Sequence, residues 1–179
     1  MPVRADARRN YERLVEQARV AFAEFGVDAS LDEIARRAGV ASGTLYRHFP
    51  TRLDLIEVVL GGQVAELVAR GRALLAAGGD AGDALATWLR AALTHALTYR
   101  GLAAAVMNSA GNSAAAWHAE MFEVGTALVD RARASGAVGA DVAGGDVLRL
   151  VGAVAWAVRD VEDGDVRAGR MLEIVLKGL

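Results

Sequence analysis

The chain contains no cysteine, which excludes disulfide bonds and thiolate metal sites among its 179 residues. Proline is also scarce, and its two occurrences leave little in the sequence to interrupt helices. No hydrophobic run has the length and apolarity of a membrane span, and none follows the N-terminal arginines as it would in a signal peptide. We therefore expect a cytoplasmic protein without membrane association.

Strand-like alternation of apolar and polar residues is missing as well, whereas alanine and leucine abound. Because 54% of the residues are hydrophobic, the chain can bury a sizeable core. We predict an all-α fold of about nine helices. Four of them precede residue 76: one from about Ala5 to Phe25, two short ones between Ser30 and Phe49, and one from Thr51 to about Leu75. The other five are predicted at Ala81–Tyr99, Leu102–Asn108, Ser113–Ala134, Asp146–Val161 and Asp165–Leu176.

The two short helices follow the helix-turn-helix pattern. Ser30 can cap the first of them while Glu33 reaches back to the Ser30 amide, which is a reciprocal capping box. Gly39 can adopt the positive φ of a helix end at little cost. The second helix begins near Ser42 and ends at Phe49, because the proline that follows disfavours the α conformation at the residue before it.

The second short helix carries more polar groups than its two turns need for packing. Gly43 allows a close approach to a phosphate. Thr44 and Tyr46 offer hydroxyl donors, and His48 offers a ring donor to phosphate. Arg47 either bonds to guanine O6 and N7 or contacts phosphate or solvent, since the rotation of so short a helix is open.

Charge is distributed unevenly along the chain. The net charge is −2, but residues 1–52 hold nine arginines and seven acidic residues, while the remainder holds eleven basic and fifteen acidic residues. A phosphate-binding surface needs clustered cations more than a high isoelectric point. Arg47 and Arg52 lie in or beside the second short helix, and Arg4 either lies near phosphate or belongs to a disordered terminus. Arg36 and Arg37 are expected to face solvent or to form ion pairs.

The first third of the chain resembles the tetracycline-repressor (TetR) family of bacterial transcription regulators, on the strength of residues 31–40 and 43–55. The resemblance implies a DNA-binding domain at residues 1–50 and a helical effector-binding and dimerisation domain at residues 51–179. It also implies that Arg52 contacts the DNA backbone. The residues that it places against the major groove or adjacent phosphates are Ser42, Gly43, Thr44, Tyr46, Arg47 and His48.

Valines near the C-terminus recur with heptad-like spacing. Helix-turn-helix regulators usually act as dimers, so the chain should contain a self-complementary surface. The predicted interface consists of Val147, Val151, Val154, Val158, Met171 and Val175. The alternative is that these side chains all belong to the internal core.

Stripes of large side chains on the helix after Asp80 and on the helix from Ser113 predict an effector pocket between these helices, because a mostly apolar lining with a few polar groups is typical of ligand sites. The candidate residues are Trp88, His95, Tyr99, Met107, Trp117 and Met121. The alternative is that the stripe is ordinary core.

No enzyme motif is present, and neither His95 nor His118 has a carboxylate at metal-site spacing, so we expect no enzyme activity, metal or cofactor. The main hypothesis is a homodimeric repressor that binds a double-stranded DNA operator and is released by a small, mainly apolar effector through a shift of the helix from Thr51 to Leu75. The alternatives are an activator, a regulator without a small-molecule effector, and a helical module or enzyme that does not bind DNA.

Overall fold

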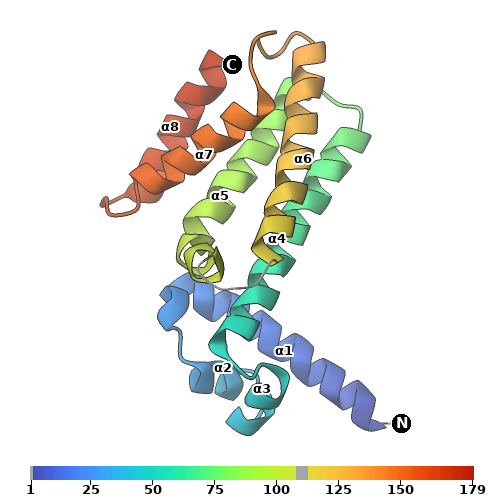
Figure 1. Ribbon diagram of the computed structural model, residues 1–179, viewed down its shortest axis with the longest axis vertical. Helices are drawn as coiled ribbons and strands as arrows, with labels where there is room; N and C mark the ends of the chain where they lie inside the picture. Colours follow the sequence, from blue (N-terminus) through green and yellow to red (C-terminus); the bar gives the residue numbers. More distant parts are fainter. Residues whose placement is uncertain (1, 108–112) are drawn as a thin grey trace. The chain divides into compact units, whose positions relative to one another are not determined.

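The computed structural model describes residues 2–107 and 113–179, and their side chains except at 2–5, 100, 107 and 113–115. The described residues form eight α-helices and one 3₁₀ turn, without strands (Figure 1), which confirms the all-α prediction. The elements are α1 Pro2–Phe25, η1 Gly26–Asp28, α2 Leu31–Arg37, α3 Ser42–His48, α4 Arg52–Ala76, α5 Ala81–Met107, α6 Ser113–Ala134, α7 Gly144–Ala157 and α8 Gly164–Gly178.

The predicted break between Tyr99 and Leu102 is wrong, because α5 runs without interruption through Gly101. One glycine inside a helix costs only about 1 kcal/mol relative to alanine. Burial of Tyr99, Leu102 and Val106, which are at most 6% exposed, favours continuation of the helix. The predicted helix end at Asn108 lies outside the described residues. Helix α7 ends at Ala157, four residues earlier than predicted, and Asp163 adopts a φ of 58° before α8 begins.

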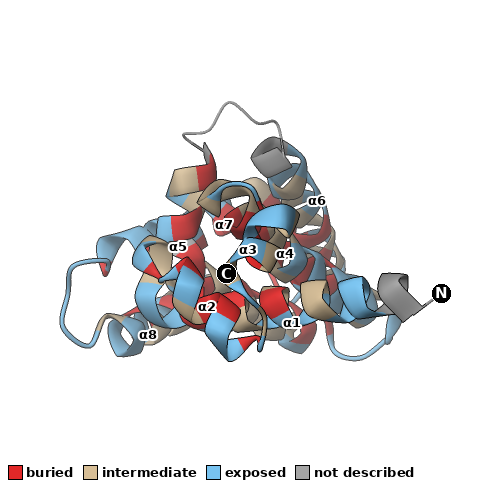
Figure 2. Ribbon diagram, turned by 90° about the horizontal axis from the view of Figure 1, so that it is seen from below, coloured by how far each residue is buried: buried red, intermediate tan, exposed pale blue. Residues whose placement is uncertain are grey.

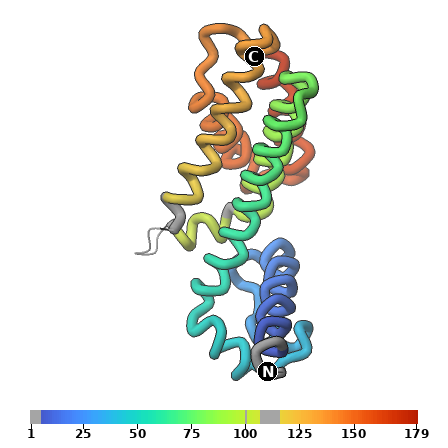
Figure 3. The backbone as a smooth tube through the Cα atoms, turned by 90° about the vertical axis from the view of Figure 1, so that its right-hand side faces the viewer, coloured from blue at the N-terminus to red at the C-terminus, as the bar shows by residue number. Residues whose placement is uncertain are grey.

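Two compact units make up the structure. The first comprises the described parts of Met1–Gly62 and Tyr99–Ala114, and the second comprises the described parts of Gln63–Thr98 and Ala115–Leu179. The chain passes from one unit into the other within α4, within α5 and in the first turn of α6, so all three connections are helical. The course of α4 and α5 can be followed in Figure 3.

The core of the first unit lies between α1, α2 and α3, whose inward residues are coloured as buried in Figure 2. Local caps set the helix starts. The Ser30 hydroxyl accepts a bond from the Glu33 amide at 3.3 Å, whereas the Glu33 carboxylate binds arginines on its own helix, so only half of the predicted capping box forms. At α4 the box is complete, because the Thr51 amide donates to Asp54 at 2.7 Å and the Asp54 amide donates to the Thr51 hydroxyl at 3.2 Å.

Trp88 of α5 lies at the centre of the second unit and is 0% exposed. Its indole nitrogen donates to the Leu67 carbonyl of α4 at 3.0 Å. The indole has room because glycines face it: a Cβ added to Gly71 would lie 2.7 Å from the indole nitrogen, and one added to Gly125 of α6 would lie 2.8 Å from the ring. The absence of these two side chains therefore allows α4, α5 and α6 to pack around Trp88.

Arg131 of α6 holds the end of α4 by donating to the carbonyls of Leu74 and Gly79. These carbonyls lie at or just beyond the last turn of α4, where helical hydrogen bonding leaves acceptors unused. Within residues 2–107 and 113–179, no helix combines the length and apolarity needed to cross a membrane.

Candidate nucleic-acid interface

Helix α3 has one buried face and one polar face. Leu45 and Phe49 are 0% and 2% exposed and hold the helix against the first unit. Tyr46 is 46% exposed, and Arg47 and Gly43 are also exposed. Ser42, Thr44 and His48 are half-buried. The structure thus gathers the predicted residues on one short helix and leaves Gly43, Tyr46 and Arg47 exposed on it.

The Arg47 side chain lies back along its own helix. Its Nη2 donates to the Thr44 hydroxyl at 2.9 Å, and its Nε donates to the Gly43 carbonyl at 3.3 Å. Both partners belong to the preceding turn of α3. These bonds direct the guanidinium toward the N-terminal end of the helix, which is the end that contacts base edges when a recognition helix enters the major groove.

Tyr11 of α1 is a neighbour of α3 that the sequence analysis missed. Its ring centroid lies 5.8 Å from the His48 ring in an edge-on arrangement and 5.2 Å from the Phe49 ring. The sequence contains a signal for this contact, since Tyr11, Leu14 and Ala18 follow one another at steps of three and four residues, and Leu14 and Ala18 are buried. Contact with Tyr11 limits the positions that the His48 ring can adopt.

Arg52 has internal partners. Its Nη1 donates to the Val27 carbonyl at 2.8 Å and also to the Ala29 carbonyl, so it joins the start of α4 to the segment after α1. Sequence reasoning missed these bonds, because the partners lie 25 and 23 residues away. The side chain of Arg4 lies outside the described residues.

Two further arginines of the first unit are paired with Glu33. The Glu33 carboxylate accepts bonds from Arg36 at 2.6 Å and from Arg37 at 2.8 Å, and these bonds lower the Glu33 pKa to about 2. The ion-paired alternative for Arg36 and Arg37 is therefore confirmed.

The predicted effector residues divide between the two units. Trp88, His95, Trp117 and Met121 belong to the second unit, whereas Tyr99 belongs to the first. His95, Trp117 and Met121 are half-buried. Burial lowers the pKa of His95, and the nearby His118, which stacks on Phe122 at 5.4 Å, lowers it further. The Met107 side chain lies outside the described residues.

The predicted dimer residues also differ in exposure. The four seam residues are at most 6% exposed and pack in the core of the second unit; they are Val147, Val151, Val154 and Val158. Met171 is 37% exposed, and Val175 is half-buried. Other large apolar side chains of α7 and α8 project outward, with Trp156 at 66% and Ile174 at 71% exposure. Heptad spacing alone did not indicate which face of α7 packs within the chain.

Comparison with known proteins agrees with this architecture. Residues 14–59 match the bacterial regulatory proteins of the tetR family, and residues 80–179 match the C-terminal domain of SbtR-like transcriptional regulators. The second match alone covers more than half of the chain. The chain belongs to the TetR family. It is therefore a helix-turn-helix transcriptional regulator, and regulators of this family are not enzymes, as the sequence predicted.

Two solved TetR-family structures are similar over nearly their full length. The regulator SCO0520 from Streptomyces coelicolor is 36% identical, with a TM-score of 0.78 over 94% of this chain and 97% of that one. A TetR regulator from Mycobacterium vanbaalenii is 34% identical, with a TM-score of 0.74 over 99% of each chain. The curated relative TtgW from Pseudomonas putida is 42% identical over 57 residues, and the match spans only 42% of its length.

Proposed function

We propose that this TetR-family regulator is a cytoplasmic, homodimeric repressor that binds a double-stranded DNA operator through α3 and is released by a small, mainly apolar effector. The observation that carries the proposal is the division of α3, which buries Leu45 and leaves Tyr46 and Arg47 exposed. A helix that needs only one face for packing has its other face available for the major groove. Residues 1–50 are the proposed DNA-binding domain, and residues 51–179 are the proposed effector and dimer domain.

The proposed DNA contacts combine base and phosphate binding. Arg47, directed along α3 by Thr44, donates to guanine O6 and N7. Arg52 uses Nη1 for two carbonyls and has its other guanidinium nitrogens for phosphate. The other proposed contact residues are Ser42, Gly43, Tyr46 and His48, together with Arg4.

Fluorescence anisotropy with a labelled promoter fragment from beside the gene tests this interface. Arg47→Ala is expected to weaken specific binding by about 10- to 100-fold, because a bidentate base contact is worth about 1–3 kcal/mol. Arg72→Ala is the matched control, since Arg72 is an exposed arginine of the second unit in an ion pair with Glu120. Unchanged affinity in Arg47→Ala, or an equal loss in the control, contradicts the assignment.

The proposed dimer surface is the outer face of α7 and α8. Its exposed apolar side chains are Leu150, Trp156, Met171 and Ile174, with Val175 beside them. Large apolar groups exposed together are typical of interaction surfaces. The four seam valines lie on the buried side of α7, in the core of the second unit. Ile174→Glu is expected to yield a folded monomer in analytical ultracentrifugation, and a variant that still sediments as a dimer contradicts the surface.

The proposed effector site lies in the second unit at Trp88, His95, Trp117 and Met121. The other two predicted residues, Tyr99 and Met107, follow on α5 in the part that belongs to the first unit. Burial keeps His95 neutral near pH 7, so its imidazole can serve as one of the few polar contacts in an apolar site. Binding of the effector is proposed to shift α4 and to change the spacing of the two α3 helices in the dimer.

A further inference from the structure

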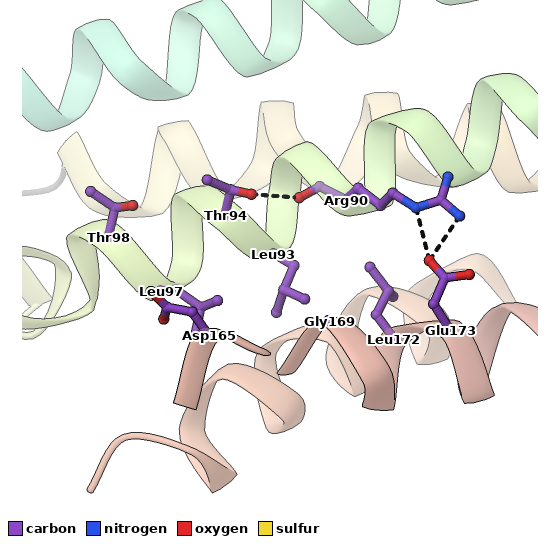
Figure 4. A pocket seen from close by; sticks show the side chains of 9 residues that line it. All are labelled: Arg90, Leu93, Thr94, Leu97, Thr98, Asp165, Gly169, Leu172 and Glu173. Carbon is purple, nitrogen blue, oxygen red and sulfur yellow. Dashed lines mark hydrogen bonds and ion pairs between the residues drawn. The ribbon is translucent and has the colours of Figure 1, made fainter. Parts of the chain in front are cut away.

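A groove of about 240 Å³ lies between α5 and α8 in the second unit (Figure 4). Its floor is apolar, because Leu93 and Leu172 are 4% and 1% exposed and Leu97 is half-buried. Gly169 contributes only backbone to the lining, and a Cβ added there would meet no atom within 4 Å. The groove is therefore open because α8 has no side chain at this position.

This groove is separate from the proposed effector site. At 100° per residue, the α5 groove residues Arg90, Leu93 and Leu97 lie on the side of the helix roughly opposite to Trp88 and His95. A molecule in the groove would contact α8, and one at the effector stripe would contact the interior of the unit. The two sites can be occupied and tested independently.

The charged groups at the two ends of the groove differ in their partners. At one end, Arg90 pairs with Glu173 at 2.8 Å, so its charge is already neutralised. At the other end, Asp165 lines the groove (Figure 4), and no described residue forms a hydrogen bond or ion pair with its carboxylate. Among the charged lining residues, Asp165 alone has no ion pair with a described residue, so the net charge of the lining is negative.

We propose that the groove binds a small primary amine with an apolar body, with the ammonium group at Asp165 and the body on Leu93, Leu97 and Leu172. The volume of the groove limits the size of the ligand. A cavity of about 150 Å³ holds a benzene ring, so the groove of 240 Å³ also admits a short aminoalkyl chain. A carboxylate ligand would meet the like charge of Asp165 and would find Arg90 already paired. The observations thus favour a cation over an anion.

Isothermal titration calorimetry with 2-phenylethylamine tests the proposal, and 3-phenylpropanoate serves as the comparison because it combines a similar ring and chain with a carboxylate. The amine is expected to bind and the acid is not. Asp165→Asn is expected to weaken amine binding by about fivefold, the upper range for a solvent-exposed ion pair. Glu162→Gln, which removes the same charge from the exposed turn before α8, should leave binding unchanged.

Gly169→Leu is expected to fill the groove and abolish amine binding, with circular dichroism and the melting temperature showing that it folds. Failure of the amine to bind the natural chain, equal binding of the acid, unchanged binding in Gly169→Leu, or an unchanged affinity in Asp165→Asn would each overturn the proposal. DNA binding is not the readout, so these outcomes leave the repressor proposal untouched.

Discussion

Gly71 and Gly62 are both inside α4, but only Gly71 faces the indole of Trp88. Alanine is favoured over glycine in a helix by about 0.5–1 kcal/mol. A Cβ on Gly62 meets nothing within 4 Å, so Gly62→Ala is expected to stabilise the protein by about that amount. A Cβ on Gly71 would overlap Val124 and lie 2.7 Å from the Trp88 indole nitrogen.

Gly71→Ala should therefore be destabilising. Overpacking a core costs about 1–3 kcal/mol, and displacement of Trp88 from the Leu67 carbonyl leaves a buried donor without a partner, which costs about 1–3 kcal/mol more. After the gain in helix propensity, we expect a net loss of about 1–5 kcal/mol. For a chain of this length, that loss lowers the melting temperature by roughly 3–15 °C.

The assay is thermal unfolding followed by far-ultraviolet circular dichroism, at one protein concentration for all variants because oligomerisation shifts the midpoint. Tryptophan fluorescence is a second readout, to which Trp88 contributes together with Trp117 and Trp156. A Gly71→Ala variant that melts at or above the temperature of the natural chain would refute the packing of Trp88 between Gly71 and Gly125. Gly62→Ala separates this steric effect from the general effect of replacing glycine in α4.

Three other substitutions probe the first unit and the pH response. Asp54→Ala removes the cap shared with Thr51 and should cost about 1 kcal/mol in urea unfolding; an unchanged midpoint would show that the cap contributes nothing. Arg52→Met should lower the free energy of unfolding by about 1–3 kcal/mol, because two carbonyls lose their donor. If the stability is unaltered and only DNA binding weakens, Arg52 acts as a phosphate contact and not as a structural link. Because the folded state lowers the pKa of His95, the unfolded chain binds more protons below about pH 6.5 and stability falls as the pH falls. His95→Gln should reduce this loss of stability when thermal unfolding is compared across that pH range. A pH profile identical to that of the natural chain would contradict the role of His95.

The sequence predicted the caps and turns well where the interacting groups are close in the chain. Thr51 and Asp54 are three residues apart, and Gly39 adopts a φ of 68° at the turn before α3. The capping box at Ser30 formed only in part because Glu33 had competing partners, Arg36 and Arg37, within four residues. A local sequence pattern thus shows which hydrogen bonds a side chain can form, but it does not decide which of several nearby partners the side chain binds.

The sequence by itself determined the helical class, the helix-turn-helix and the apolar face of α3, because these depend on hydrogen bonds and periodicity within a few residues. Only the tertiary structure decided that the seam valines, Val151 among them, are buried in the chain's own core, that Arg52 binds carbonyls more than 20 residues away, and that Gly169 leaves a groove beside α5. Spacing identifies a face of a helix, but which element covers that face depends on packing between segments far apart in the sequence.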